Sequence, residues 1–280
     1  MARLSSLQKY REKTFRVIQP LTSLSEAVQF VQERGALFFW PIKELVFPSL
    51  WVAVAGDRPV PNEHDDPAQI TWDWKDTMLD KKIWYYAKIL RKRSTILSLD
   101  IAPFFYALSE NYGDPEGDYL FAYRQGKLSS EAKRIYEAIL EFGKLDTIQL
   151  KQKSHLASPE HESRFNTALA ALQSDFKIVP VGIADAGPWH YAFIYDLTSR
   201  QYPEIIEKAR WISPQIARQE IMVNYFKSMG YSNMDWIQKL FQWNPLDISK
   251  TIDKLIENQF LQKQTFPELP GGWIVLSEIG

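Results

Sequence analysis

Cysteine is absent from this 280-residue chain, and glycine is scarce, with 12 residues. The lack of cysteine excludes disulfides, thiolate nucleophiles and cysteine-ligated zinc. The few glycines form neither a G-x-G-x-x-G nor a G-x-x-x-x-G-K-[ST] motif, which argues against an enzyme driven by nucleotides. We therefore expect no nucleotide cofactor, no other cofactor and no bound metal.

Excess charge of either sign is also lacking, because 33 Lys and Arg oppose 34 Asp and Glu. A nucleic-acid partner would thus have to bind a local basic face rather than the chain as a whole. No apolar run reaches the roughly 18 residues of a membrane span, and no apolar core follows Arg3 near the start of the chain. We expect a cytoplasmic protein without a membrane partner. What is abundant is aromatic residues, at 14%, including ten Trp.

The first part of the chain combines a helix with an extended aromatic run. Ser23 and Glu26 have the spacing of a capping box, which predicts a helix over 24–34. The run that follows, 36–41, is predicted to be extended, because its proline disfavours helical backbone at Trp40. Two further elements are predicted in this part, a helix over 70–90 and a strand over 95–101.

A pattern of three helices and a β-hairpin then occurs twice, at a spacing of roughly 80 residues. The first copy is predicted to have helices over 128–143, 146–150 and 158–176 and strands over 176–183 and 189–195. The second copy is predicted to have helices over 216–228, 234–241 and 245–258 and strands over 260–266 and 273–276. This is the order of a winged helix, a helix-turn-helix variant. The sequence therefore predicts a mainly α fold with small β-hairpins (α+β), built from tandem winged-helix domains at 1–125, 126–205 and 206–280.

Two segments carry a resemblance to a known family. The segment 193–200, with Pro203 after it, is similar to a Y-D-L-x-x-R…P signature, and 71–79 lies where the family has a Y-W-A-H-E-A-S-L-L helix. With this order of segments the chain resembles the AlkZ/YcaQ DNA glycosylases, bacterial crosslink-repair enzymes that excise bulky or crosslinked alkylated bases. The resemblance implies a bacterial protein whose three winged helices form a crescent around double-stranded DNA, damaged or distorted. We expect it to be a monomer.

At the matching positions this chain lacks the two polar residues of that family's catalytic motif. The motif is Gln-hydrophobic-Gln or Gln-hydrophobic-Asp, and its two polar positions fall on Phe38 and Trp40. Cleavage of an N-glycosidic bond needs a polar group that stabilises the oxocarbenium-like sugar and orients water. An indole face stabilises a cation by ~0.5–2 kcal/mol, far below the ~8 kcal/mol that an enzyme supplies at the least. We interpret Phe38 and Trp40 either as a stacking platform for an unstacked base or as part of a buried core.

The densest polar cluster lies on a proline-flanked loop and consists of Glu63, His64, Asp65 and Asp66. Its carboxylates and imidazole could serve general acid–base catalysis. The alternative is a solvated acidic loop whose end starts the next helix. If catalysis has moved away from the family motif, this loop is the first candidate, and Asp73 and Asp76 on the adjoining helix are weaker ones.

The clearest basic cluster is formed by Lys88, Arg91, Lys92 and Arg93. We expect it to contact DNA phosphates, although a solvated helix end is the alternative interpretation. Arg164, on the third helix of the middle domain, is a further candidate for DNA contact.

The leading hypothesis is therefore a DNA-binding protein that recognises damaged or distorted DNA, with base excision left open. A rival hypothesis is a non-catalytic scaffold that binds a small aromatic ligand or a protein, and a third is a transcription regulator.

Overall fold

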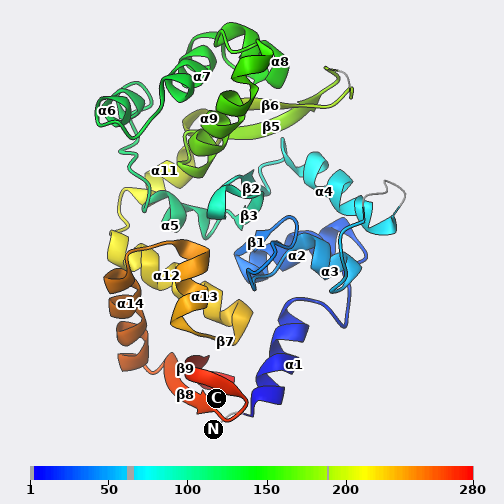
Figure 1. The fold of residues 1–280 in the computed structure, drawn as a ribbon, viewed down its shortest axis with the longest axis vertical. Helices are drawn as coiled ribbons and strands as arrows, with labels where there is room; N and C mark the ends of the chain where they lie inside the picture. Colours follow the sequence, from blue (N-terminus) through cyan, green and yellow to red (C-terminus); the bar gives the residue numbers. More distant parts are fainter. Residues whose placement is uncertain (1–2, 62–65, 188, 280) are drawn as a thin grey trace.

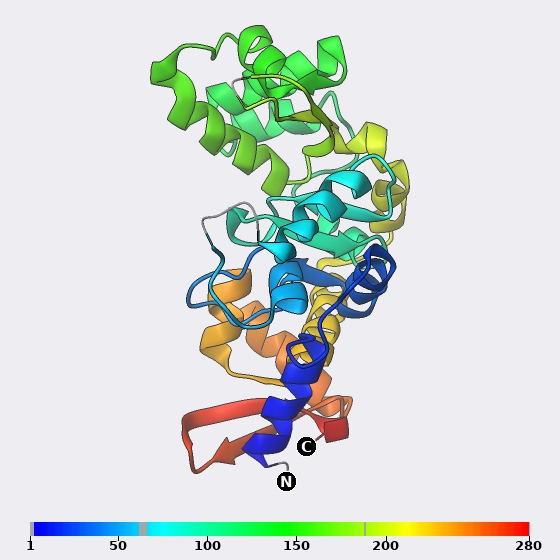
Figure 2. The same cartoon turned by 90° about the vertical axis from the view of Figure 1, so that its right-hand side faces the viewer.

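The computed structural model describes residues 3–61, 66–187 and 189–279. Over these residues the molecule is elongated, with the segment around residues 130–150 at one end of its long axis and the C-terminal hairpin at the other (Figures 1 and 2). The described part contains three antiparallel sheets of three strands, and in each the last strand of the chain order lies in the centre. No helix of the described part is both long enough and apolar enough to cross a membrane.

The first sheet belongs to a segment that we name the first repeat, residues 24–98. Its elements are α2 (Leu24–Arg34), β1 (Ala36–Phe38), α3 (Leu50–Ala55), α4 (Ile70–Met78), β2 (Trp84–Ala87) and β3 (Thr95–Ser98), with the short turns η1 (Pro67–Gln69) and η2 (Leu90–Lys92). The predicted helix 24–34 is confirmed, and the side chain of Ser23 accepts a hydrogen bond from the backbone N–H of Glu26. The carboxylate of Glu26 in turn accepts from the N–H of Thr22 at 2.7 Å.

The helix predicted over 70–90 is wrong in its second half. The structure ends α4 at Met78, turns the chain at residues 79–83, where Lys82 has φ 53°, and forms the strand β2. All four residues of β2 are buried, and they pair with β3 in antiparallel register. An aromatic run buried on both faces fits a strand inside a core better than a helix with one solvated face. The predicted strand 95–101 ends early, at Ser98, because α5 begins at Ala102.

The second and third repeats, residues 130–197 and 214–276, have the same order of elements. The second contains α7 (Ser130–Phe142), β4 (Leu145–Asp146), α8 (Thr147–Lys153), η3 (Pro159–His161), α9 (Glu162–Ser174), β5 (Ile178–Ala184) and β6 (Ala192–Leu197). The third contains α12 (Pro214–Met229), β7 (Tyr231–Ser232), α13 (Met234–Phe241), α14 (Pro245–Glu257), β8 (Leu261–Phe266) and β9 (Leu269–Leu276). The predicted elements of both segments are thus present. The tandem winged-helix interpretation and the domain boundaries at 125 and 205 stay predictions.

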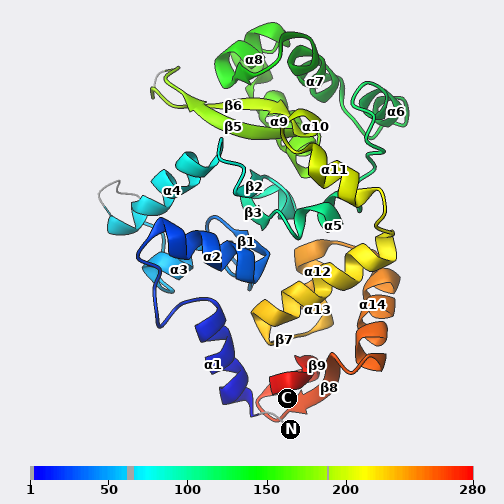
Figure 3. The ribbon, with the colours of Figure 1, turned by 180° about the vertical axis from the view of Figure 1, so that it is seen from behind.

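One apolar core is shared by the first and third repeats and includes Phe176, Val179 and Val181 of the second. Phe38 and Leu97 of the first repeat and Phe226 and Ile252 of the third lie in the same cluster of buried side chains. Helix α12 connects them, because it packs against α2, α5 and α14 (Figure 3). The second repeat has a core of its own, drawn from residues 119–197. The remaining elements cover these cores: α1 (Leu4–Thr14), α5 (Ala102–Tyr106), α6 (Asp118–Arg124), α10 (Thr198–Gln201), α11 (Pro203–Ala209) and η4 (Ser277–Ile279).

Gly35 is required where α2 meets α12. Its φ is +68°, and a Cβ placed there would lie 2.4 Å from Nδ2 of Asn224. We expect Gly35→Ala to lower the free energy of unfolding by about 1–2 kcal/mol, from backbone strain and crowding together. Gly126→Ala is the matched control, since Gly126 has φ +70° but no atom within 4 Å of the added Cβ. Urea unfolding should show the smaller loss in the control; equal losses would mean that the contact with Asn224 adds nothing.

Candidate functional site

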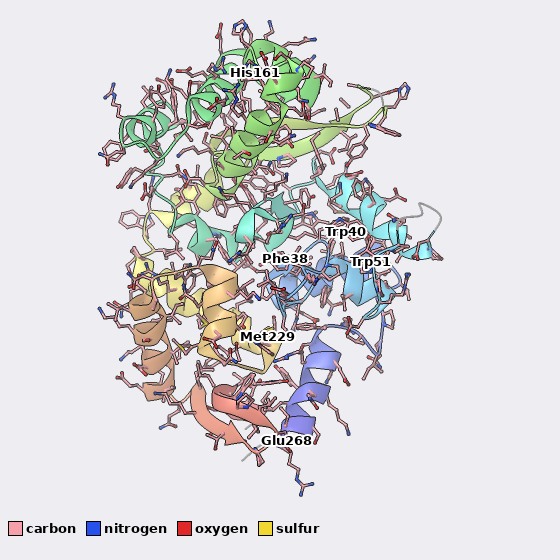
Figure 4. All side chains as sticks on the ribbon, viewed as in Figure 1. Phe38, Trp40, Trp51, His161, Met229 and Glu268 are labelled. Carbon is pink, nitrogen blue, oxygen red and sulfur yellow. The ribbon has the colours of Figure 1, made fainter. Side chains whose placement is uncertain are left out.

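Phe38 and Trp40, to which the resemblance assigns the family motif, face different surroundings. Phe38 has no exposed surface and packs edge-to-face against Phe47 at 5.5 Å. Phe39, between the two, is buried as well. Trp40 is half-buried and lines a cavity. Trp40 is therefore available for stacking, and Phe38 is part of the core. Figure 4 labels both residues.

The cavity beside Trp40 has a volume of about 1030 Å³. Its walls come from the first repeat and from the hairpin of the second, and its lining residues are Trp40, Val60, Pro61, Gln69, Ile70, Trp72, Asp73, Trp189 and Tyr191. Trp189 lies in the connection between β5 and β6 and is 88% exposed. An open cavity with four aromatic rings and one carboxylate on its wall suits a planar, uncharged or weakly cationic ring.

The aromatic wall of the cavity continues into the protein. The ring centroids of Trp40 and Trp72 are 6.1 Å apart, and those of Trp72 and Tyr191 are 5.7 Å apart. Behind Trp40 lies the buried ring of Trp51, at 5.0 Å. Since Trp72 belongs to α4 and Tyr191 to the hairpin, their contact closes the wall between two repeats. In Figure 1 the end of the β5–β6 hairpin lies above α4.

Directly behind this wall is a lysine with no exposed surface, Lys75. Its Nζ donates to Oδ1 of Asp76 at 2.5 Å and to Oη of Tyr191 at 2.8 Å. The hydroxyl of Tyr191 donates to the same oxygen of Asp76 at 2.9 Å. The three groups thus form a closed triangle that links α4 to the hairpin, and we name it the Lys75 network.

Aromatic rings surround the ammonium of Lys75. Its Nζ lies 4.3 Å from the ring centroid of Trp72 and 4.6 Å from that of Phe193. Burial lowers the pKa of Lys75, and the hydrogen bond and charge of Asp76 oppose that shift. Burial and the carboxylate of Asp76 raise the pKa of Tyr191, which keeps its hydroxyl protonated and able to donate. The aromatic faces compensate part of the lost hydration of the cation.

The sequence analysis missed Lys75, although a signal is present in the sequence. Thr71, Trp74, Lys75 and Met78 have the i, i+3, i+4, i+7 spacing of a single helix face, and all four are buried. A lysine on the apolar stripe of a helix predicts a buried charge that needs a partner. The distant partner, Tyr191, could not be read from spacing.

The acidic loop is described only at its end. Glu63, His64 and Asp65 lie outside the described residues. Asp66 accepts hydrogen bonds from Nη2 of Arg58 at 2.6 Å and from the backbone N–H of Ala68 at 2.8 Å. The hydrogen bond from Arg58 lowers the pKa of Asp66. Asp66 therefore caps the turn before α4.

Asp73 and Asp76, the weaker catalytic candidates, lie in different surroundings. Asp73 is exposed and lines the cavity, whereas Asp76 belongs to the Lys75 network. Nowhere in residues 3–61, 66–187 and 189–279 do three or more potential metal-ligating His, Asp or Glu side chains gather.

The basic cluster forms the connection between β2 and β3. Arg91 and Lys92 have left-handed backbone, with φ 58° and 53°. Nη1 of Arg91 donates to the backbone carbonyl of Lys239 at 2.8 Å, and the N–H of Lys88 donates to Oε1 of Gln173 at 3.2 Å. The side chains of Arg91, Lys92 and Arg93 are exposed, and Lys88 is half-buried, which lowers its pKa.

Arg164 does not join this basic turn. Its guanidinium is exposed and lies 3.5 Å from a carboxylate oxygen of Glu131. Gln173, which contacts the turn, lies nine residues further along α9, or ~13 Å along the helix axis. Arg164 therefore belongs to a separate surface.

Comparison with known proteins defines first the fold and then the family. The structure is similar to that of the Streptomyces sahachiroi DNA glycosylase AlkZ, with a TM-score of 0.60 at 14% sequence identity. The match covers 99% of this chain and 70% of that one, and it confirms a mainly α fold with small β-hairpins. Among curated proteins no sequence matches the chain. A sequence profile of the family described as AlkZ related matches residues 21–242, so this protein belongs to the AlkZ-related family.

Removal of the anion and removal of the cation of the Lys75 network should affect the stability of the protein to different degrees. Asp76→Asn leaves a buried ammonium without its anion, so we expect a loss of about 2–4 kcal/mol in the free energy of unfolding. Lys75→Met replaces the cation by an apolar chain of similar length, so we expect a change within about 1 kcal/mol. Urea unfolding of both variants measures the difference. If Lys75→Met lost as much as Asp76→Asn, the ammonium would itself be a major source of stability, against this prediction.

Proposed function

We propose that this protein binds double-stranded DNA and recognises damaged or distorted sites by stacking an unstacked base in the aromatic cavity. The observation that carries the proposal is the cavity itself, with Trp40 and Trp72 on one repeat and the exposed Trp189 on another. Membership of the AlkZ-related family supports DNA as the partner. The solved structure to which this chain is similar is that of a DNA glycosylase.

Stacking favours distorted DNA for an energetic reason. A base in intact duplex must first lose its stacking and pairing, whereas a base opposite a lesion or at a mismatch is already weakly held. An aromatic side chain that stacks on a base contributes about 1–3 kcal/mol. The cavity volume of about 1030 Å³ leaves room for a nucleobase. Discrimination then follows from the lower cost of extruding the base.

The basic turn supplies the part of binding that does not depend on sequence. Lys92 and Arg93 extend from a loop that is itself held by Gln173 and Lys239. Phosphate contacts of this kind set affinity and make it dependent on salt.

The proposed function is recognition of damaged DNA, and it includes no base excision by the residues at positions 38 and 40. Phe38 is buried, and the indole N–H of Trp40 can donate to water but cannot accept a proton from it as a general base does. Asp73 is the carboxylate on the cavity wall among the described residues. Any release of an alkylated base should therefore be lost in Asp73→Asn or when the loop 63–66 is replaced by alanine, with DNA affinity kept.

The test of recognition is fluorescence anisotropy with a short duplex, either intact or carrying a central abasic-site analogue opposite an unpaired base. We expect the wild type to prefer the abasic duplex and Trp189→Ala to lose about tenfold in affinity for it, as the loss of one stacking contact predicts. Trp211→Ala is the matched control, since Trp211 is 86% exposed and lies outside the cavity.

Equal weakening in both tryptophan variants, or a wild type without preference, would contradict the assignment of the cavity to unstacked bases. Binding of a free planar aromatic compound in the absence of any DNA binding would favour the small-ligand scaffold, which the apolar cavity wall also suits.

The role of the basic turn is tested by a salt series. Each phosphate contact removed lowers the slope of log K against log salt by about 1. We therefore expect the double variant Lys92→Gln, Arg93→Gln to bind intact and abasic duplexes more weakly to the same degree, with a slope smaller by about 2. Lys9→Gln, an exposed lysine on α1, is the control and should leave the slope unchanged. An unchanged slope in the double variant would place the phosphate contacts elsewhere.

A further inference from the structure

The far end of the β5–β6 hairpin has little apolar burial to hold it. The register of the two strands shifts between Pro180 and Gly182, and beyond that shift Ala192 is the one buried residue among those described. Ile183 and Phe193 are only partly buried against the core of the first repeat. The connection contains left-handed backbone at Gly187 and His190. A segment of this kind opens at low free energy unless a specific contact fixes it.

The Lys75 network is such a contact. Two hydrogen bonds join Tyr191, on the hairpin, to α4: its hydroxyl accepts from the ammonium of Lys75 and donates to the carboxylate of Asp76, and these two charged groups pair with each other. Hydrogen bonds to charged groups are stronger and more directional than neutral ones. An apolar residue at position 75 would fill the same space but would offer the hydroxyl and the carboxylate no donor.

Both walls that meet at the cavity contact the same ammonium. Trp72 lies 4.3 Å from Nζ of Lys75, and Tyr191 accepts a hydrogen bond from it. Both side chains line the cavity, whereas Lys75 does not. The ammonium is thus placed to set the angle between the two walls without contact to a ligand.

We propose that Lys75 is the positioning residue of the aromatic cavity, which it maintains by fixing Tyr191 and Asp76 and thereby docking the β5–β6 hairpin on α4. This inference rests on the proposed function, because it gives the docked hairpin a role in accepting an unstacked base. Without the ammonium, the partly exposed carboxylate of Asp76 regains hydration by turning outward. Tyr191 then loses both partners and is no longer held against Trp72, and the neighbouring Trp189 loses its fixed place on the cavity wall.

The docking itself is tested without DNA, by hydrogen exchange of the full chain followed by mass spectrometry. Lys75→Met should increase exchange in the hairpin peptides about tenfold, as the loss of one charge-assisted hydrogen bond predicts, and should leave the β8–β9 hairpin unchanged. Lys81→Met is the matched control, because Lys81 also faces an adjacent aspartate, Asp80 at 3.4 Å, but in an exposed pair. Tyr191→Phe removes only the hydroxyl and should act in the same direction as Lys75→Met.

The consequence for recognition is tested with the abasic and intact duplexes. In Lys75→Met the preference for the abasic duplex should fall to nearly none, while affinity for intact duplex stays within twofold; a merely structural role would lower both. The inference would be overturned if the hairpin peptides of Lys75→Met and Tyr191→Phe exchanged at the wild-type rate. It would also be overturned if Lys75→Met kept the wild-type preference for the abasic duplex. A wild type that shows no preference would refute the proposed function and the role in recognition together, and the exchange experiment would still decide whether Lys75 docks the hairpin.

Discussion

The apolar core shared by the first and third repeats is the constraint on which the arrangement of this chain depends. Each sheet has three strands and depends on the helices packed against it for a core. Tyr225 and Phe226 of α12 lie in one cluster with side chains of both repeats, so these repeats cannot separate without exposing it. Trp40 and Trp72 pack against a neighbouring core of the first repeat, whereas Trp189 and Tyr191 belong to the second repeat. The cavity therefore lies where the first and second repeats meet.

Burial of a lysine at the junction of two repeats costs hydration free energy, so its presence there indicates a role other than stability. An ion pair inside a protein often stabilises the fold no more than apolar residues of similar size would. The space around Nζ, between Trp72 and Phe193, would accept an apolar side chain. What the ammonium adds is direction: it can bind a carboxylate and a phenol at once and in one geometry. The Lys75 network therefore exchanges some stability for a defined orientation of the hairpin.

Much of the fold could be predicted from periodicity and caps, because these are local. Ser23 and Asp146 cap their helices as their spacing indicates. The strand at 84–87 could not be predicted, since its partner β3 and its burial on both faces are tertiary properties. In the site, Trp40 and Asp73 could be named from the sequence. The contact of Lys75 with Tyr191 could not, because it spans 116 positions.

The basic turn between β2 and β3 touches all three repeats. It belongs to the first, its Lys88 N–H donates to Gln173 of the second, and Arg91 donates to Lys239 of the third. A loop anchored in this way has lost most of its conformational entropy before any ligand arrives. A phosphate bound by Lys92 or Arg93 would thus meet preorganised charges and would order little besides two side-chain ends. Movement of one repeat against another would strain one of these two hydrogen bonds and so displace the charges of the turn.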